Sequence, residues 1–238
     1  MGKACNRMPR PIHTILGASV ACLLAMATSN PVLGQQVNQL RGPAGCIPIS
    51  ERKMELGCYV VTAEALGELP RTQLYWQIVS YPTRSAADAA KGARGTVVEA
   101  VDQIWLMTIA EAGYRPTGGT LIAEIGPLST KAGTKYTATY MQGIMMPGAD
   151  TPVHYHAGPE ALYTLAGEEC METTEGKFAS RPGGTPIIVP GETSHKLTIT
   201  GTTQRRSLAL ILADSAQPLM LMGAHDHNWT PKGLCKVE

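Results

Sequence analysis

The amino-acid sequence predicts an all-β protein, and its second half predicts an antiparallel sandwich or barrel. From Tyr136 onward, short runs of β-branched and aromatic residues alternate with turns that contain Gly or Pro, a pattern typical of many short antiparallel strands. One of these runs places two histidines two residues apart, so both side chains lie on the same face of a strand. A chain of 238 residues is long enough for one sizeable domain, or for one domain with an appendage.

The N-terminal part, residues 35–130, is expected to add further strands and one short helix. The runs with strand composition are 58–63, 73–81 and 120–126. Residues 85–91 follow Pro82 and stop before Gly92, which is typical of a short helix. Residues 96–110 fit either a pair of strands or a helix.

The second half contains the denser series of strand signals. The expected strands are 136–146, 152–156, 161–165, 168–174, 185–189, 195–200 and 205–213. No internal repeat is evident, and residues 47–130 contain no histidine. The supply of ligands therefore excludes a second histidine metal site in the N-terminal half, while a degenerate, metal-free barrel there stays open.

The most informative motif lies between Gly148 and Gly167 and has the spacing G-x5-H-x-H-x3-E-x6-G. His154 and His156 alternate onto one face of their strand. Residues 157–159, with the sequence Ala-Gly-Pro, can reverse the chain, so that Glu160 returns beside them on a neighbouring strand. Two imidazoles and one carboxylate that converge on a point suit Zn, Fe, Mn, Ni or Cu.

This stretch resembles the first conserved motif of the cupin superfamily at every position. That family's second motif, G-x5-P-x-G-x2-H-x3-N, is matched in part downstream by Gly184, Pro190 and His195. The second glycine comes one residue early, as Gly191, and Ile199 stands in place of the asparagine. The spacing from proline to histidine is kept, so His195 is in register to be a fourth ligand.

The resemblance covers about residues 136–215 and implies a cupin double-stranded β-helix (jelly-roll) barrel. On this basis we expect a barrel at 131–215, preceded by the N-terminal extension and followed by a tail at 216–238. The resemblance further implies that one divalent transition metal (Fe, Mn, Ni, Zn or Cu) binds to His154, His156, Glu160 and His195. Glu160 is also the expected catalytic residue. The alternative is a barrel that has kept its shape and lost its metal.

A second H-x-H pair, His225 and His227, lies in a polar tail with no following glutamate. We interpret this pair as solvated or locally hydrogen-bonded, with a ligand role as the alternative.

Strand alternation also predicts which side chains line the barrel interior. If the two motif histidines face inward, Tyr155 and Tyr163 face outward. The side chains expected to face inward are Leu162, Thr164, Leu197 and Ile199. The strand at 136–146 presents either Tyr140 and Gln142 or Met141 and Gly143, depending on its register. A mostly apolar wall favours a small pocket with the metal as its main polar feature.

The N-terminus has the composition of a signal peptide. Lys3, Arg7 and Arg10 precede an apolar run that ends near Ala27, a run too short to span a bilayer. We expect a signal peptide at 1–34 and a secreted or periplasmic protein; a retained membrane anchor is the alternative.

Removal of such a signal peptide leaves four cysteines, Cys46, Cys58, Cys170 and Cys235. Four cysteines in an exported protein predict two disulfides, and all three pairings stay open. A cysteine metal site is the alternative, but none of the spacings forms a CxxC arrangement.

The charge distribution excludes one class of partner. The net charge is +1, and the pair Arg205-Arg206 is too small a basic cluster for a nucleic-acid footprint. The expected partner is a small-molecule substrate or ligand, with no membrane contact after signal cleavage and a homodimer left open. Because fold and ligands do not select a reaction, three functions stay open: a dioxygenase-type oxidoreductase, a non-catalytic binding or sensing cupin, and a metal-dependent isomerase or lyase.

Overall fold

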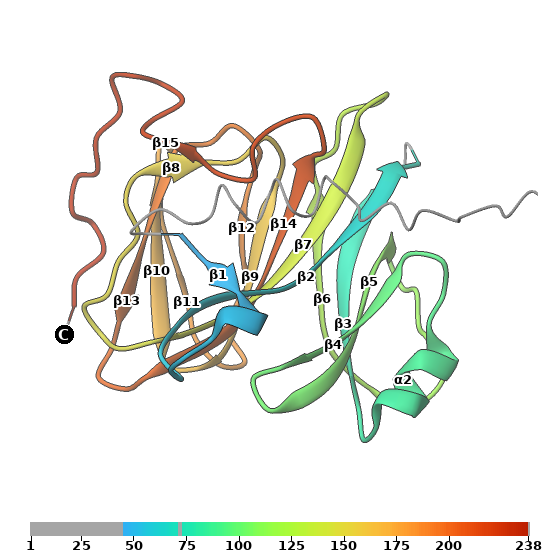
Figure 1. The fold of residues 1–238 in the computed structure, drawn as a ribbon. Helices are drawn as coiled ribbons and strands as arrows, with labels where there is room; N and C mark the ends of the chain where they lie inside the picture. Colours follow the sequence, from blue (N-terminus) through green and yellow to red (C-terminus); the bar gives the residue numbers. More distant parts are fainter. Residues whose placement is uncertain (1–44, 71–72, 238) are drawn as a thin grey trace, which may run out of the picture.

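The computed structural model describes residues 45–70 and 73–237, so the expected signal peptide at 1–34 lies outside the described residues. The described chain forms three β-sheets and one short α-helix (Figure 1). No helix in this part of the chain is long and apolar enough to cross a membrane. The all-β fold class predicted from the sequence is confirmed.

The central six-stranded sheet has the order β1-β2-β7-β14-β9-β12. Its strands are β1 (Ile47–Pro48), β2 (Gly57–Glu68), β7 (Lys135–Met145), β14 (Arg205–Asp214), β9 (Glu160–Ala166) and β12 (Ile187–Val189). All neighbours are antiparallel except β1, which runs parallel to β2. A 3-10 turn, η1 (Ile49–Glu51), follows β1.

The five-stranded sheet has the order β11-β10-β13-β8-β15. Its strands are β11 (Gly176–Ser180), β10 (Glu168–Thr173), β13 (His195–Thr200), β8 (His154–Tyr155) and β15 (Leu221–Met222). From β7 to β15 the chain alternates between the two sheets, except for the hairpin β10–β11, which stays within the five-stranded sheet. This winding makes a double-stranded β-helix, the cupin type of jelly roll.

The interior of this barrel is filled by inward-facing residues of both sheets. The buried apolar cluster includes Val60, Met141, Leu162, Met171, Leu197, Ile199, Ala209 and Ile211. Leu162, Leu197 and Ile199 were expected to face inward, and this is confirmed. The register of the strand at 136–146 is now fixed, because Met141 belongs to this cluster while Tyr140 packs on the opposite face of the sheet.

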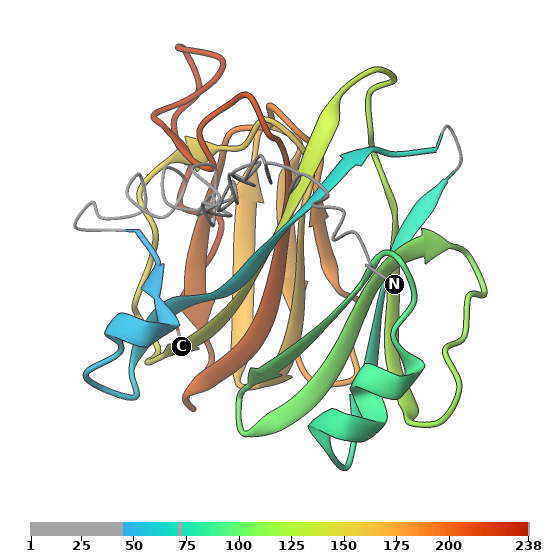
Figure 2. The ribbon, with the colours of Figure 1, turned by 45° about the vertical axis from the view of Figure 1, so that its right-hand side comes forward.

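The third sheet has the order β4-β5-β3-β6 and packs against the outer face of the six-stranded sheet (Figure 2). Its strands are β4 (Gly95–Ala100), β5 (Gln103–Glu111), β3 (Leu74–Tyr81) and β6 (Thr120–Leu128). The core between the two sheets contains Trp76, Trp105, Tyr140, Leu208 and Leu210. The predicted domain boundary at residue 131 stays a prediction; in the fold, β2 already lies in the barrel sheet.

Two local predictions are resolved in this N-terminal half. The ambiguous segment 96–110 is a strand pair, β4 and β5, and its turn residues Val101 and Asp102 have positive φ angles of 50° and 61°. The helix α2 (Arg84–Ala90) is capped by Thr83, whose Oγ1 accepts a hydrogen bond from Ala86 N at 3.2 Å. The short strands β1, β11 and β15 were not predicted.

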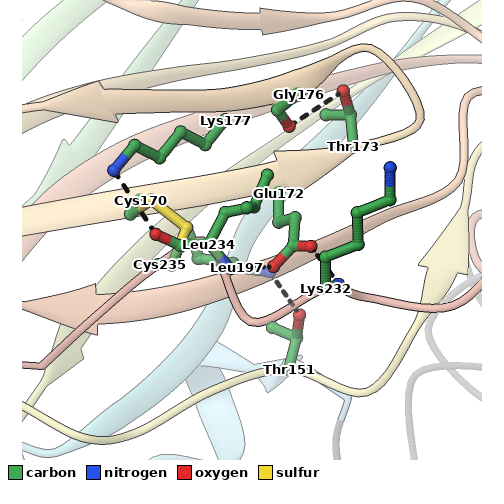
Figure 3. The surroundings of a disulfide bond; sticks show 10 residues. All are labelled: Thr151, Cys170, Glu172, Thr173, Gly176, Lys177, Leu197, Lys232, Leu234 and Cys235. Atoms are coloured by element: carbon green, nitrogen blue, oxygen red, sulfur yellow. Dashed lines mark hydrogen bonds between the residues drawn. A yellow bond between two sulfur atoms is a disulfide. The ribbon is translucent and has the colours of Figure 1, made fainter.

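The four cysteines form two disulfides, Cys46–Cys58 and Cys170–Cys235. Cys170 lies on the outward face of β10, where its bond holds the C-terminal segment against the sheet (Figure 3). The Glu172 carboxylate on the same face accepts hydrogen bonds from the backbone N–H groups of Lys232 and Leu234. The structure thus selects one of the three pairings that the sequence left open.

Candidate metal centre

The winding of the chain brings the four predicted ligands to one end of the barrel. His154 on β8 and His195 on β13 are direct cross-strand partners in the five-stranded sheet. Glu160 is the first residue of β9 in the facing sheet. His156 follows β8 and begins the short connection that crosses from one sheet to the other.

Two glycines let this connection pack tightly. Gly158 has a φ of 152°, and a Cβ there would lie 2.1 Å from the carbonyl oxygen of Leu212. A Cβ on Gly191 would lie 2.8 Å from the Cα of Gly158. The turns of the two cupin-like motifs therefore press against each other, and only residues without a side chain fit at the contact.

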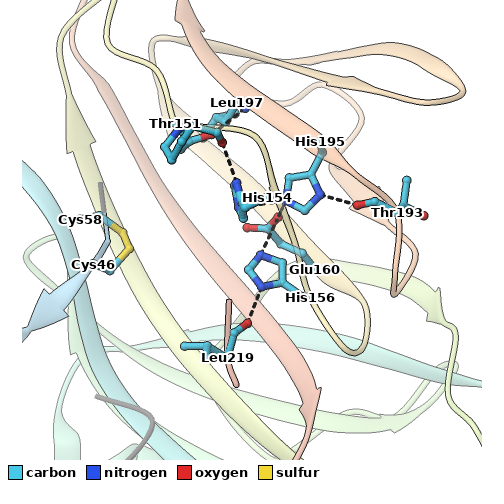
Figure 4. Close-up of polar contacts among 11 residues, drawn as sticks. Cys46, Cys58, Thr151, His154, His156, Glu160, Thr193, His195, Leu197 and Leu219 are labelled. Carbon is cyan, nitrogen blue, oxygen red and sulfur yellow. Dashed lines mark hydrogen bonds and ion pairs between the residues drawn. A yellow bond between two sulfur atoms is a disulfide. The ribbon is translucent and has the colours of Figure 1, made fainter. Parts of the chain in front are cut away.

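The four side chains are buried and point at one another (Figure 4). One ligand atom from each of His154, His156, Glu160 and His195 lies within 4.8 Å of every other. The Nε2 atoms of His154 and His195 are 3.0 Å apart, and Glu160 Oε2 lies 3.1 Å from His195 Nε2. Among the described residues, this is the one group of His, Cys, Asp or Glu side chains that can hold a metal ion.

The other ring nitrogen of each histidine contacts a backbone carbonyl. His154 Nδ1 lies 2.9 Å from Pro152 O, His156 Nδ1 lies 2.5 Å from Leu219 O, and His195 Nδ1 lies 2.8 Å from Thr193 O. A carbonyl oxygen can only accept, so Nδ1 must carry the proton in every ring. In the neutral rings all three Nε2 lone pairs are then free for a ligand role, which is the usual arrangement around a protein-bound metal.

Two atoms at the centre of the group have no hydrogen-bond partner. These are His156 Nε2 and Glu160 Oε2, both of which are buried. A buried polar atom without a partner carries a free-energy cost of about 1–3 kcal/mol, and a cation between the four side chains would satisfy both atoms. The residues present therefore fit a metal ion.

The surroundings favour the ligand forms of these residues. Burial, and then the neighbouring histidines, lower the pKa of His154 to about 3. Burial also lowers the pKa of His156 to about 4, although Glu160 opposes this shift. For Glu160, burial raises the pKa, but His195, His156 and His154 together outweigh it and bring the value to about 2. At neutral pH the site holds a carboxylate beside neutral His154 and His156.

A small cavity of about 70 Å³ adjoins this group and runs into the barrel. His154, His156 and Glu160 form part of its wall. The apolar part of the wall consists of Met141, Met145, Leu162, Met171, Leu197, Ala209, Ile211 and Met220, and the Cys46–Cys58 disulfide also lines it. The mostly apolar wall expected from strand alternation is present.

One feature of the wall was not predicted. Arg205 lines the cavity while its side chain is only 3% exposed, and it forms an ion pair with Glu169, which is fully buried. Its neighbour Arg206 faces the other way and pairs with Asp102. Strand alternation from the inward-facing Ala209 and Ile211 would have placed Arg205 inside the barrel, because odd-numbered residues of β14 share one face.

The second H-x-H pair, in the C-terminal tail, does not contribute to this group. The backbone N–H of His225 donates to Ser194 Oγ at 2.7 Å, and its ring packs on Tyr155 with centroids 5.0 Å apart. Neither His225 nor His227 belongs to the group that can hold a metal. The solvated or locally hydrogen-bonded role expected for the two imidazoles stays a prediction.

No protein-family model and no curated protein matches this sequence. Solved structures that are similar include a DMSP lyase from Ruegeria pomeroyi, which is 19% identical with a TM-score of 0.32, over 36% of this chain and 42% of that chain. A cupin superfamily protein from Desulfitobacterium hafniense is 16% identical with a TM-score of 0.30, over 37% of this chain and 74% of that chain. A cupin-like protein from Thermotoga maritima is 13% identical with a TM-score of 0.33, over 40% of this chain and 74% of that chain.

The aligned part thus spans less than half of the DMSP lyase. Two of these three solved structures are described as cupins. The fold assignment itself rests on the winding of the strands between the two barrel sheets.

Proposed function

We propose that this protein is an exported cupin that binds one divalent transition metal and catalyses an oxidation of dioxygenase type on a small organic substrate. Its metal ligands are His154, His156, Glu160 and His195. The observation that carries the proposal is the set of backbone carbonyls at the three Nδ1 atoms, which leaves every Nε2 lone pair free in a group whose ligand atoms all lie within 4.8 Å of one another. The two disulfides support export, because such bonds persist in oxidising compartments.

The donor set suits Fe, Mn, Ni, Zn or Cu. When bound, an ion of this kind supplies a Lewis acid with coordination positions left over for a deprotonated substrate and for dioxygen. Glu160 has two further roles in the proposal. Its carboxylate would offset part of the charge of a bound ion, and it would accept the proton that the substrate loses.

The apolar wall excludes water from the site and holds the substrate body. The ionisable side chains that line the cavity are His154, His156, Glu160 and Arg205. Apart from the ligands, no acid or base therefore lies on the described wall near the site. This lining favours oxygen chemistry over an isomerase or lyase reaction, for which a second proton-transfer group is expected.

The same lining also suits a non-catalytic binding or sensing cupin, which is the second candidate. The test begins with metal analysis of natively purified protein, where about one transition metal per chain is expected. Oxygen uptake is then screened with small organic acids and ketones. Substrate-dependent uptake supports the proposal, turnover without oxygen identifies an isomerase or lyase, and tight binding without turnover identifies the binding module. Protein that holds no metal after reconstitution would overturn the proposal.

A further inference from the structure

The strand registers divide the barrel interior into three levels of inward-facing residues. Across β9 and β14 the paired residues are Glu160 with Ile211, Leu162 with Ala209, and Thr164 with Ser207. Across β13 and β10 they are His195 with Thr173, Leu197 with Met171, and Ile199 with Glu169. The first level holds the candidate metal ligands and the second is apolar. The third level contains a second set of polar side chains.

At this third level a buried ion pair crosses the barrel. Arg205 from β14 pairs with Glu169 from β10, and the exposed fractions of their side chains are 3% and 0%. Thr164 Oγ1 donates to the other carboxylate oxygen, Glu169 Oε1, at 2.6 Å. Glu169 is thus held by partners from the facing sheet, and its charge balances that of the guanidinium.

The guanidinium lies along the wall in the direction of the metal ligands. Ser207 is the cross-strand partner of Gly143, and a Cβ on Gly143 would lie 2.3 Å from Arg205 Nη1. Arg205 therefore reaches from its own position on β14 up to the level of Ser207. Only glycine at position 143 leaves room for this arrangement.

Two donors at this level have no hydrogen-bond partner. Arg205 Nε and Ser207 Oγ are both buried and unpaired, and both residues line the cavity that His154, His156 and Glu160 also line. Buried donors are normally paired. Neighbouring atoms cover both donors in this structure, so an oxygen acceptor on a bound molecule reaches them after a small shift of the Arg205 and Ser207 side chains.

The cavity limits the size of that molecule. Its volume of about 70 Å³ corresponds to roughly five to seven water-sized positions at about 10–15 Å³ each. The Cα atoms of Glu160 and Thr164 are about 13 Å apart along β9 at about 3.3 Å per residue. Side chains reach into this gap from both ends, so a short linear molecule can span it.

The charges in the barrel limit the charge of the molecule. With a divalent ion bound, the ion, Glu160, Arg205 and Glu169 carry a net charge of +1 in a largely apolar interior. A ligand with one negative charge neutralises this total, whereas a second carboxylate beside Glu169 would add an unbalanced charge in a buried place.

We propose that Arg205 and Ser207 bind the far end of the substrate, and that the substrate is a short, linear monoanion. Its charged group lies at the metal, its body contacts Leu162, Met171 and Ala209, and its other end carries a neutral oxygen acceptor. This inference rests on the proposed metal site and names the class of substrate that the site takes.

Three probes of similar length test the proposal on the metal-loaded protein: butyrate, 4-hydroxybutyrate and succinate. Isothermal titration calorimetry should show that 4-hydroxybutyrate binds about tenfold more tightly than butyrate, as a hydrogen bond to a charged donor allows. Succinate should bind more weakly than 4-hydroxybutyrate because of its second charge. Equal affinities for butyrate and 4-hydroxybutyrate, or a preference for succinate, would overturn the inference.

Two variants assign the preference to the named residues. Ser207→Ala removes one donor and should reduce the preference for 4-hydroxybutyrate severalfold. The double change Arg205→Met with Glu169→Leu removes both charges together, because loss of the arginine alone would leave a buried carboxylate unpaired; it should abolish the preference. Thr108→Val is the control, since Thr108 is another buried hydroxyl without a partner but lies outside the barrel, on β5.

Metal content is measured first in every preparation. This measurement distinguishes a failure of the proposed metal-dependent function from a failure of the inferred substrate contacts of Arg205 and Ser207. Wild-type protein without metal contradicts the proposed function. Wild-type protein with metal, in which the preference survives Ser207→Ala unchanged, contradicts the inference alone. If the double variant does not fold, Ser207→Ala and its control still decide the question.

Discussion

His154 and His195 lie directly opposite each other on β8 and β13, with their Nε2 atoms 3.0 Å apart. Such a distance would normally indicate a hydrogen bond. In both rings, however, Nδ1 already donates its proton to a backbone carbonyl, of Pro152 and Thr193 respectively. In the neutral form that binds a metal, the two rings direct lone pairs at each other, and a cation between them turns this repulsion into attraction.

This relationship predicts that His195 is a ligand and not only a turn residue. His195→Ala should leave a three-ligand site that still binds metal. The metal affinity should fall by more than about tenfold, because the loss of a residue that only hydrogen-bonds to a ligand already lowers affinity by at least about this factor. His225→Ala is the matched control, because His225 lies outside the group. Titration of the metal-free proteins with Zn²⁺ or Co²⁺ gives the dissociation constants. Identical constants for wild type and His195→Ala would remove His195 from the site.

The two disulfides should differ in their effect on the metal site. Cys46–Cys58 lines the cavity beside the ligands, whereas Cys170–Cys235 lies on the outward face of β10. Replacement of Cys46 and Cys58 by serine should speed the transfer of metal to a chelator severalfold, since β1 and the residues next to it lose their covalent attachment to β2. The matched double variant of Cys170 and Cys235 should release metal at the wild-type rate.

A stopped-flow measurement with a chromogenic chelator gives both release rates. Thiol counting on denatured, unreduced wild-type protein should find no free thiol among these cysteines. The expectation fails if the two double variants release metal equally fast.

Glu172 should determine how firmly the C-terminal segment is held. Its two carboxylate oxygens accept from the backbone N–H groups of Lys232 and Leu234. Glu172→Gln replaces one acceptor by an NH₂ group, so one partly buried N–H loses its charged partner. We expect the free energy of unfolding to fall by about 1–3 kcal/mol and trypsin to cleave faster after Lys232.

The control for this change is Glu175→Gln, at an exposed position on the neighbouring turn. Urea denaturation and limited proteolysis, with the disulfides intact, measure the two effects. If both variants behave alike, the hydrogen bonds of Glu172 do not hold the segment.

Much of the site could be predicted because its ligands lie at fixed spacings within short stretches of the sequence. The period of two along a strand placed His154 and His156 on one face, and the same rule placed Leu162 and Leu197 inside the barrel. The acceptor for His156 Nδ1 could not be predicted in this way. It is the carbonyl of Leu219, which lies 63 residues further along the chain, and a backbone carbonyl leaves no mark on side-chain composition.

Strand alternation predicted which side chains share a face, but it could not predict which sheets pack against each other. Trp76 and Trp105 indicate strands with one buried side, yet nothing in their spacing shows that this side packs against the outside of the barrel. For Arg205, alternation along β14 would place the side chain inside the barrel, but its partner Glu169, on a strand of the other sheet, could not be predicted. Long-range pairing decides such cases, and one sequence alone does not contain it.

The metal-free protein should lose stability in acid. Burial lowers the pKa of His154 to about 3 and that of His156 to about 4, below the ordinary value of about 6.5 that applies to the unfolded chain. At pH values between the folded and the unfolded pKa, the unfolded chain binds more protons than the folded protein. The stability is therefore fully present above about pH 6.5 and is lost as the pH falls toward 4. The free energy of unfolding at pH 5 should therefore lie more than about 1 kcal/mol below its value at pH 7.5.

Urea denaturation of protein stripped of metal, at the two pH values, makes this comparison. The triple variant His154→Asn, His156→Asn and Glu160→Gln serves as the control, because it removes both titrating histidines together with the carboxylate whose low pKa depends on them. Its stability should change much less between the two conditions. Loading wild type with metal should also flatten the dependence near neutral pH and shift the loss to lower pH, since protons must then displace the ion before they reach the rings. Equal free energies for metal-free wild type at pH 5 and pH 7.5 would show that the two histidines are not held in their neutral form.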